Sequence, residues 1–314
     1  MNRPRVEYNL AASALRRAQL NPERTALVFE EEEILYGEFG DRVRRQASLL
    51  RDSGVCVGDR VGYLGFNHPA LLETLFAAQA LGAIFVPLNF RLTAEELTFI
   101  INDAGVHSLV VDDALRETLE TARPNLCCRE FFSSESEADG WRHLHTERAD
   151  ADPLDSVATV DQHDVAIIMY TSGTTGLPKG AMLTHGNIIW NNFNANLAFG
   201  CSRDDVILTV APLFHIGGLN VMTLGSFHMG SRLVLLRNFD PQQVLKDLAR
   251  YKVTHMFGAP AMFLFMSQQA EFADTDLSHI KNLICGAAPV PESLIELYGS
   301  RDIDFCQGYG LTET

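Results

Sequence analysis

The first half of the chain alternates apolar runs with amphipathic stretches, a pattern typical of strands that alternate with helices. Two short apolar segments around an acidic turn at Glu30–Glu33 predict a hairpin ahead of this alternation. The Thr93-x-x-Glu96 spacing predicts a capped helix that ends near Gly105. Repeated β-α-β units with apolar strands predict a mostly parallel sheet covered by helices on both faces. The segments that predict strands are 25–30, 34–36, 60–66, 83–88 and 108–112, and those that predict helices are 36–51, 68–81 and 93–103.

A polar and acidic stretch at 133–164 interrupts the alternation, which then resumes. It contains few large apolar residues, so we expect a linker or a surface excursion there. The chain therefore divides into two predicted α/β lobes, residues 1–164 and 165–314, each close to the usual size of a domain. The later segments that predict strands are 165–170, 206–210, 232–236, 253–257 and 283–285, and those that predict helices begin near 187 or span 241–251 and 291–298.

Composition and charge exclude several classes of protein. The 314 residues are 46% hydrophobic and 21% charged, which excludes a disordered chain. The formal net charge is −15 and no basic patch is evident, which argues against binding to nucleic acids or anionic membranes but not to small anions. The six cysteines show no C-x-x-C spacing and no apolar leader is evident, so we expect reduced thiols and a cytoplasmic location. The longest apolar stretch, 257–266, is too short to span a bilayer.

The strongest chemical signal is the string Tyr-Thr-Ser-Gly-Thr-Thr-Gly-Leu-Pro-Lys-Gly at 170–180, which directly follows an apolar predicted strand. Its glycines let the backbone turn tightly, its hydroxyl and N–H groups can donate to phosphate oxygens, and Lys179 adds positive charge. Open α/β sheets bind ligands at this position, beyond the carboxyl end of a parallel strand. The string is not a Walker A loop, because Gly180 follows the lysine. The alternative is a surface turn without function.

A second signal, Gln-Gly-Tyr-Gly-Leu-Thr-Glu-Thr at 307–314, follows the apolar segment 303–305. Alone, it is equally typical of a turn with a packed tyrosine. Together and in this order, the two motifs resemble those of the acyl-adenylate-forming (AMP-binding) superfamily, which includes acyl-CoA synthetases. The resemblance covers nearly the whole chain, as the N-terminal portion of such an enzyme. It implies two flavodoxin-like lobes with mostly parallel sheets covered by helices.

The resemblance also implies roles for individual residues at the nucleotide. Tyr309 would stack on adenine, Thr312 would contact the α-phosphate and Glu313 would hold Mg²⁺. These roles suit an aromatic ring, a hydroxyl group and a hard carboxylate, and they place Thr312 and Glu313 among the catalytic residues. Taken alone, Glu313 would be an ordinary exposed carboxylate. The other residues that the resemblance assigns to ATP are Thr171, Ser172, Gly173, Thr174, Thr175, Gly176, Lys179, Gly286, Ala287, Ala288, Gln307, Gly308 and Gly310.

The segment Ala211–Gly218 matches the part of the family that lies beside the carboxylate substrate. The resemblance places His215 there as a catalytic and substrate-contacting gate, although a lone histidine among apolar residues is more often part of a packed core. No acidic residue stands in this segment, which argues against an α-amino acid. The resemblance places the acyl pocket at 257–263 and 286–291, and no arginine stands in these segments, which argues against a dicarboxylate. The other residues assigned to the substrate are Gly217, Gly258, Ala259 and Gly308.

The implied reaction is that of an acid–thiol ligase. With ATP and Mg²⁺, an apolar monocarboxylic acid, fatty or aryl, is converted to acyl-AMP with release of pyrophosphate, and the acyl group is then transferred to coenzyme A. The alternatives are transfer to a carrier protein or an amine, and a non-catalytic module that binds nucleotide or acyl groups. The chain ends at Thr314, before the family's β-barrel part, its hinge and its small mobile domain with a C-terminal lysine. We therefore expect a fragment of weak or no activity, and a homodimer stays open.

Overall fold

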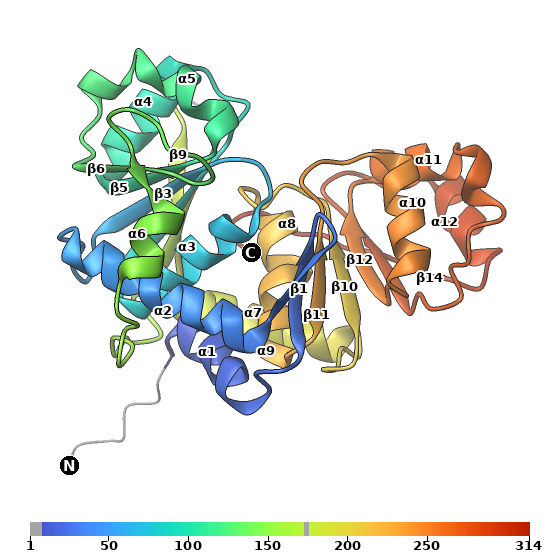
Figure 1. Ribbon diagram of the computed structural model, residues 1–314. Coiled ribbons are helices and arrows are strands. Elements are labelled where there is room, and N and C mark those ends of the chain that lie inside the picture. Colours follow the sequence, from blue (N-terminus) through green and yellow to red (C-terminus); the bar gives the residue numbers. More distant parts are fainter. Residues whose placement is uncertain (1–7, 173–175) are drawn as a thin grey trace. The chain divides into compact units, whose positions relative to one another are not determined.

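The structure, a computed structural model, describes residues 8–172 and 176–314. The chain divides into two compact units, which Figure 1 colours along the sequence. The first unit comprises the chain up to Pro22 together with Tyr36–Trp190, and the second comprises Glu23–Leu35 and Asn191–Thr314. Each unit contains a mostly parallel sheet flanked by helices, which confirms the predicted fold class.

The sheet of the first unit has seven strands among the described residues, in the order β7-β6-β5-β3-β4-β8-β9. Neighbouring strands run parallel, except that β8 and β9 form an antiparallel pair. The strands are β3 (Arg60–Leu64), β4 (Ile84–Leu88), β5 (Val106–Val111), β6 (Glu130–Ser133), β7 (Arg142–His143), β8 (Val165–Thr171) and β9 (Lys179–Thr184). The helices are α1 (Leu10–Leu20), α2 (Tyr36–Asp52), α3 (Pro69–Ala80), α4 (Ala94–Ala104), α5 (Arg116–Glu120) and α6 (Leu144–Asp150), with 3₁₀ turns η1 (Asp113–Leu115) and η2 (Arg123–Asn125).

Two helices show how the first sheet is covered. Every residue of α3 is buried, and this helix packs against α1, α2, β3 and β4. The apolar face of α4 packs on strands β3, β4 and β5. Helix α4 begins and ends as its sequence predicts: Thr93 and Glu96 form a reciprocal capping box, and Gly105 closes the helix with a φ of 62°. The core beneath α4 includes Leu64, Val86, Leu97, Ile101 and Leu109.

The acidic stretch at 133–164 is more structured than a linker. It contains strand β7 and helix α6, and Trp141 packs into the same core as α4. Leu144 is fully buried at the start of α6. Arg148, in the same helix, forms an ion pair with the buried Glu73 of α3. A few buried side chains therefore anchor a segment whose polar composition predicts an excursion.

The sheet of the second unit also has seven strands among the described residues, in the order β14-β13-β12-β10-β11-β1-β2. Its strands run parallel apart from the antiparallel hairpin β1–β2. The strands are β1 (Thr25–Phe29), β2 (Glu32–Leu35), β10 (Val206–Thr209), β11 (Arg232–Leu235), β12 (His255–Gly258), β13 (Asn282–Cys285) and β14 (Asp304–Gln307). The helical elements are α8 (Ile216–Gly218), the π-helical turn η3 (Leu219–Thr223), α9 (Leu224–Met229), α10 (Pro241–Arg250), α11 (Pro260–Ser267), the 3₁₀ turn η4 (Ala270–Phe272) and α12 (Glu292–Gly299). Helix α7 (His185–Ala198) begins in the first unit and ends in the second.

Aromatic rings organise the core beneath α10, α11 and α12. Phe263 of α11 makes edge-to-face contacts with Tyr298 of α12 and with Phe305 of β14. The buried Tyr298 hydroxyl donates a hydrogen bond of 2.9 Å to the carbonyl oxygen of Phe263, so its polar end is satisfied. This packing joins α11 and α12 to β14. The loops that follow β12, β13 and β14 carry nine of the twenty predicted site residues.

The two units differ from the predicted lobes, 1–164 and 165–314, in two places. Strands β8 and β9 belong to the first sheet, where Ile167 lies opposite Phe85 of β4. The hairpin β1–β2 belongs to the second sheet, where Leu27 lies opposite Leu233 of β11. Hydropathy marks β8 and β1 as buried strands, but it does not say which sheet each strand joins. Among the described residues, no helix is both long and apolar enough to cross a membrane.

Candidate functional site

The second unit has a cavity of about 330 Å³ at the carboxyl ends of its parallel strands. Open α/β sheets bind ligands at this edge, because the loops that follow neighbouring strands meet there. The wall combines residues of α7 and of the helix that begins at Ile216 with residues that end or follow β12, β13 and β14. The predicted site residues that line the cavity are His215, Gly217, Gly286, Ala287, Gly308, Tyr309 and Gly310.

His215 stands at the start of the helix that forms one side of the cavity. Its Nδ1 accepts a hydrogen bond of 3.2 Å from the backbone N–H of Gly217, so the ring caps helix α8. An accepting Nδ1 carries no proton, and the neutral ring therefore presents Nε2–H as a donor. The histidine is an exposed cap at the cavity wall, which differs from the packed core position that its apolar neighbours would also allow.

Two glycines let this helix approach the sheet closely. A Cβ atom on Gly217 would lie 2.7 Å from the ring of Phe257. A Cβ atom on Gly218 would lie 2.2 Å from the carbonyl oxygen of Pro212. Both distances are far below van der Waals contact, so only glycine permits this packing. The aromatic wall at Phe257 is held against the helix as a result.

The segments that follow β13 and β14 lie side by side at the cavity. The Gly308 N–H donates a hydrogen bond of 2.7 Å to the carbonyl oxygen of Cys285. A Cβ atom on Gly286 would lie 3.2 Å from the carbonyl oxygen of Gly308, so the glycine allows this close approach. Ala287 has a φ of 70°, a left-handed conformation that costs a residue with a side chain about 1–2 kcal/mol. Strain of this kind often occurs at functional sites, where the surrounding structure maintains it.

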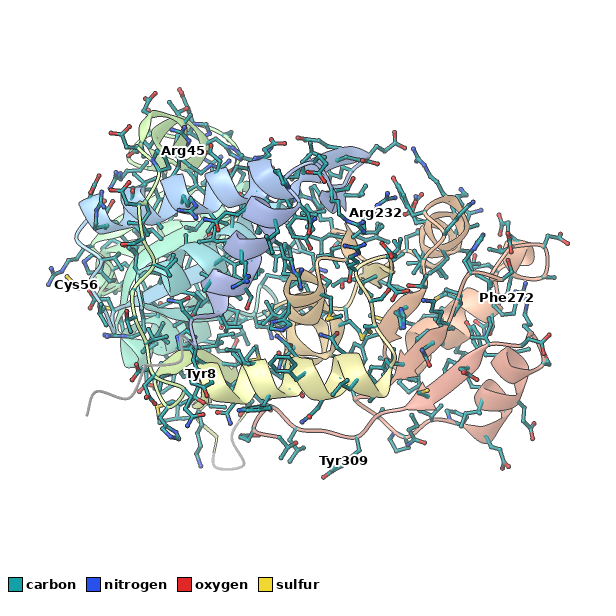
Figure 2. All side chains as sticks on the ribbon, turned by 90° about the horizontal axis from the view of Figure 1, so that it is seen from below. Tyr8, Arg45, Cys56, Arg232, Phe272 and Tyr309 are labelled. Atoms are coloured by element: carbon teal, nitrogen blue, oxygen red, sulfur yellow. The ribbon has the colours of Figure 1, made fainter. Side chains whose placement is uncertain are left out.

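Tyr309 is 93% exposed, and Figure 2 shows its side chain projecting away from the ribbon. Both faces of the ring are therefore accessible to a planar partner. Beyond it the chain closes a turn, in which the Leu311 N–H donates 2.8 Å to Thr314 Oγ1. Glu313 is exposed, and Thr312 is half-buried. Neither residue lines the cavity, although both are close in sequence to residues that do.

The glycine-rich string lies in the first unit, between β8 and β9. Thr171 and Lys179 lie opposite one another in the antiparallel pair, which holds the two ends of the string together. Gly176 has a φ of 99°, a conformation that glycine adopts without strain. Ser172 and Lys179 are exposed. Three of the residues assigned to ATP, Gly173, Thr174 and Thr175, lie outside the described residues.

A tyrosine anchors the strand that leads into this string. The Tyr170 hydroxyl donates a hydrogen bond of 2.6 Å to the Asp103 carboxylate at the end of α4. Burial, together with the nearby Asp103 carboxylate, raises the pKa of the Tyr170 phenol, so it stays protonated as the donor. The carboxyl end of β8 is therefore hydrogen-bonded to α4, a helix of the same unit.

Some predicted residues lie elsewhere, and some wall residues were not predicted. The predicted residues that do not line the cavity are Gly258, Ala259, Ala288 and Gln307. At Gly258, a Cβ atom would face the ring of Phe263 at 3.0 Å. The asparagines Asn191, Asn194 and Asn220 do line it, although the sequence did not predict them as site residues. The cluster of asparagines between 187 and 196 is the signal that could have drawn attention to α7.

The fit to a magnesium ion depends on Glu313. Within the described parts of the chain, no three His, Cys, Asp or Glu side chains gather as they would around a metal ion. Mg²⁺ is usually bound by one or two carboxylates together with substrate phosphates and water. An exposed carboxylate such as Glu313 fits that mode, in which the nucleotide supplies most of the ligands.

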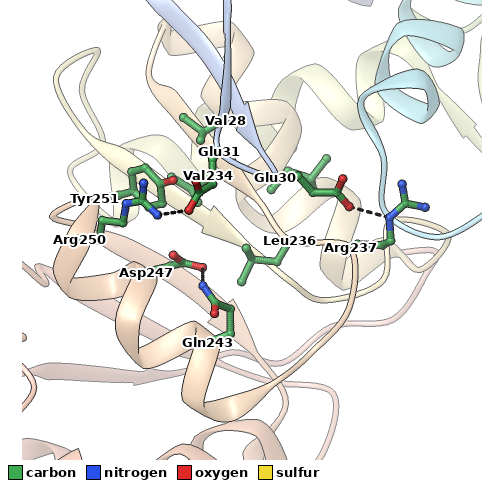
Figure 3. A pocket seen from close by; sticks show the side chains of 11 residues that line it. Val28, Glu30, Glu31, Val234, Leu236, Arg237, Gln243, Asp247, Arg250 and Tyr251 are labelled. Carbon is green, nitrogen blue, oxygen red and sulfur yellow. Dashed lines mark hydrogen bonds and ion pairs between the residues drawn. The ribbon is translucent and has the colours of Figure 1, made fainter. Parts of the chain in front are cut away.

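A second cavity, of about 200 Å³, lies beside the hairpin β1–β2 (Figure 3). Its charged groups already pair with one another: Arg237 with Glu30, and Arg250 with Glu31, at 3.0 and 2.6 Å. The buried Asp247 accepts a hydrogen bond of 3.0 Å from Gln243. Burial outweighs this hydrogen bond and raises the pKa of Asp247. These pairings support the hairpin and offer little to a ligand.

Comparison with known proteins matches this chain to one family along almost its whole length. A model of the AMP-binding enzyme family matches residues 15–314. A feruloyl-CoA synthase of Amycolatopsis sp. is 40% identical over 304 residues, which cover 97% of this chain and 59% of that protein. An indoleacetate–CoA ligase of Aromatoleum aromaticum is 36% identical over 95% of this chain and 59% of its own length. The chain thus spans about 60% of the length of these curated relatives.

A solved structure extends the match to three dimensions. The inhibitor-bound N-terminal domain of FACL13 from Mycobacterium tuberculosis superposes with a TM-score of 0.87 at 28% sequence identity. The match covers 98% of this chain and 77% of that domain. The arrangement of two mostly parallel sheets is therefore the arrangement of this family's N-terminal region.

Proposed function

Since the chain belongs to the AMP-binding enzyme family, we propose that it activates an apolar monocarboxylic acid, fatty or aryl, for transfer to coenzyme A. The acid and ATP would form acyl-AMP and pyrophosphate, and a thiol would then take the acyl group. The observation that carries this proposal is the cavity at the carboxyl ends of β12, β13 and β14, with the exposed Tyr309 on its wall. Relatives named as a CoA synthase and a CoA ligase support the same reaction class.

The first step joins two anions, so the protein must position them and offset their charge. An oxygen of the substrate carboxylate attacks the α-phosphorus of ATP, and the bond from that phosphorus to the departing pyrophosphate breaks. We assign adenine to the Tyr309 ring, the α-phosphate to the Thr312 hydroxyl and the metal-binding carboxylate to Glu313. Mg²⁺ would supply charge stabilisation at the phosphates. The residues assigned to the β- and γ-phosphates are Thr171, Ser172, Gly176 and Lys179, together with 173–175.

The cavity wall supports an uncharged acyl tail. Phe257, Val221 and Ile284 supply apolar surface, and His215 supplies an N–H donor near the expected carboxylate. Among the described residues that line the cavity, none is an aspartate, glutamate, lysine or arginine. An α-amino acid would require a carboxylate for its amine, and a dicarboxylate would require a cation. A monocarboxylic acid needs neither.

Other parts of the proposal concern the second step and the setting. We propose coenzyme A as the acceptor because the curated relatives reported above are named as a CoA synthase and a CoA ligase. Transfer to a carrier protein or to an amine is the competing acceptor chemistry within the family. We further propose a cytoplasmic location. We propose weak or no turnover for this chain alone, which has about 60% of the length of its relatives.

Exchange of labelled pyrophosphate into ATP tests the first step without assuming an acceptor. We expect exchange that depends on Mg²⁺ and on one class of acid from a panel of fatty and aryl acids. Calorimetric binding of Mg²⁺-ATP to the same chain provides a second readout that does not require turnover. The absence of both acid-dependent exchange and nucleotide binding would contradict the proposal.

The Glu313→Gln variant tests the metal assignment. The amide keeps the size of the side chain but removes its charge, so we expect exchange to fall at least about tenfold and to need more Mg²⁺ for half of its maximum. Glu296→Gln, at an exposed position of α12, is the matched control and should leave the Mg²⁺ dependence unchanged. An unchanged Mg²⁺ dependence in Glu313→Gln would refute the assigned role.

A further inference from the structure

A π-helical turn forms part of the cavity wall. The helix that starts at Ile216 continues through η3 (Leu219–Thr223) into α9, so the wider turn is enclosed by helical turns on both sides. Such turns are rare and occur frequently at functional sites. Side chains bind two carbonyl groups here, one at Gly218 just before the turn and one at Asn220 within it. The Thr223 hydroxyl donates 2.7 Å to the Gly218 oxygen, and the Asn191 amide donates 3.0 Å to the Asn220 oxygen.

These side-chain hydrogen bonds stabilise the wide turn. The Thr223 hydroxyl also shares a hydrogen bond of 2.8 Å with Thr209 of β10, which ties the turn to the sheet. Asn191 belongs to α7, so a second helix holds the turn from the other side. The position of Asn220 is therefore fixed by contacts to two other elements.

The Asn220 side chain carries an unsatisfied polar atom. Asn220 is only 8% exposed and lines the cavity, and its Oδ1 is buried without a hydrogen-bond partner among the described residues. A buried polar atom without a partner is costly, and native proteins rarely retain one without a reason. The neighbouring wall residues Val221, Phe257 and Ile284 are apolar and offer no partner. The missing partner is therefore expected from whatever occupies the cavity.

We propose that Asn220 is a specificity-determining residue that hydrogen-bonds a hydroxyl group on the tail of the acid. This inference rests on the proposed function and narrows its substrate class to hydroxylated monocarboxylic acids. The nitrogen and oxygen of an amide are assigned by their hydrogen bonds, so either could be the unsatisfied atom. A hydroxyl group both donates and accepts, and it satisfies Asn220 in either orientation. An unsubstituted alkyl or aryl tail would leave the buried amide unpaired.

Binding of matched acids to this chain tests the inference. The probes are cinnamate with 4-hydroxycinnamate, and dodecanoate with 12-hydroxydodecanoate, so that the two pairs separate an aryl from an alkyl tail. Calorimetry and pyrophosphate exchange are measured for each acid. We expect the hydroxylated member of one pair to bind about tenfold more tightly than its parent, the ratio typical of one net hydrogen bond of about 1.4 kcal/mol.

The variant Asn220→Leu has a similar size but no polar atoms. We expect it to bring the ratio between hydroxylated and parent acid to about one, by weakening the hydroxylated acid and leaving the parent acid bound as well or better. Asn220→Ser, which keeps a hydrogen-bonding group, should retain part of the preference. Asn238→Leu is the matched control, because Asn238 is an exposed residue of the same unit outside the cavity wall, and it should leave the ratio unchanged. Thermal unfolding of each variant checks that it folds.

The outcomes separate this inference from the proposed function. Equal binding of both members in both pairs by the unaltered chain would overturn the role of Asn220 while leaving acid activation intact. A preference that persists in Asn220→Leu would also overturn it. Failure of all four acids to bind or to support exchange would contradict the proposed function, and the inference with it.

Discussion

Glu73 is a carboxylate inside the first unit, with a side chain that is only 1% exposed. It receives Arg42 of α2 at 3.3 Å on one oxygen and Arg148 of α6 on the other. Burial by itself would raise the pKa of Glu73, but the two guanidinium groups outweigh it and hold the pKa below the ordinary 4.5. The carboxylate is thus ionised at neutral pH, and it joins three helices at one point.

Removal of this carboxylate should destabilise the first unit strongly. In Glu73→Ala, two arginines would lose their buried partner, and we expect the free energy of unfolding to fall by about 3–5 kcal/mol. Urea denaturation measures the change. Glu38→Ala removes the other partner of Arg42, but at a half-exposed site, so it should cost less than about 1 kcal/mol. Equal losses in the two variants would show that the buried cluster contributes no more than a surface ion pair.

In the second unit, the packing around Gly218 does not leave room for one added carbon atom. A methyl group in Gly218→Ala would lie 2.2 Å from one backbone oxygen and 2.7 Å from another, and neither can move without shifting the turn before α8. We expect a loss of about 1–3 kcal/mol in stability, together with weaker binding of the acid, since the cavity wall would move. Gly299→Ala provides the comparison, because nothing lies within 4 Å of its Cβ position. That variant should be neutral or slightly stabilising in the same thermal unfolding experiment.

Helices α6 and α7 each depend on a histidine that accepts a hydrogen bond at Nδ1. His145 accepts from Arg148 at 3.0 Å, and His185 accepts from the backbone N–H of Leu10, the first residue of α1, at 3.3 Å. Burial, and for His145 also the charge of Arg148, lowers the pKa of each ring from 6.5 to about 4. Protonation would remove the accepting lone pair and place a charge in a buried site. His185 therefore joins α7 to α1, and His145 contacts the Arg148 that pairs with Glu73 of α3.

The stability of the first unit should fall as the pH falls from 6.5 to 4. In this window the unfolded chain binds a proton at each histidine while the folded chain does not, so the unfolding free energy rises with pH and its histidine contribution is complete above 6.5. Urea denaturation at several pH values measures the slope. The double variant His145→Gln, His185→Gln should have a flatter slope in this window. An unchanged slope would mean that neither ring is held neutral in the folded state.

Elements with local signals were predicted well from the sequence, and those that depend on tertiary contacts were not. The capping box at Thr93 and the glycine at 105 fix α4 through bonds within a few residues, and the prediction is confirmed. Strand β9 was missed because its six residues are mostly polar or partly exposed and depend on pairing with β8. The π-helical turn at 219–223 was also missed, since its carbonyls are satisfied by Thr223 and by Asn191 of another helix. No local pattern encodes the distant partner Asn191.

The same distinction applies to the candidate site. The string at 170–180 and the motif at 307–314 carry their chemistry in consecutive residues, and so they could be recognised by resemblance. Asn220 becomes notable only when the fold buries its amide in an apolar wall. In sequence it is one asparagine among several. A resemblance can therefore indicate the reaction class, while the geometry of the wall is needed to narrow the substrate.

At the scale of the whole molecule, the assignment of strands to sheets does not follow the order of the chain. The hairpin β1–β2 precedes nearly all of the first unit in sequence, yet it forms the edge of the second sheet beside β11. Its buried face includes Leu27, which packs without exposure opposite Leu233. The second unit thus contains a segment that lies more than 150 residues before its remaining strands. A boundary drawn from sequence alone would cut this sheet.

This arrangement leads to a prediction for a fragment of residues 185–314, which keeps all of α7 but lacks the hairpin. Without β1 and β2, the backbone edge and the apolar side chains of β11 would be exposed, and exposed apolar edges pair with other chains. We expect this fragment to aggregate, and the same fragment fused to residues 23–35 through a long Gly/Ser linker to be soluble and to unfold cooperatively. Size-exclusion chromatography and urea denaturation distinguish the two.

The control is the fused fragment with Leu27→Asp, which places a charge at a fully buried position and should not restore solubility. If the fragment without the hairpin is monomeric and as stable as the fused one, β1 and β2 are dispensable for the second sheet. The contribution of this early segment to the later sheet would then have no effect on stability.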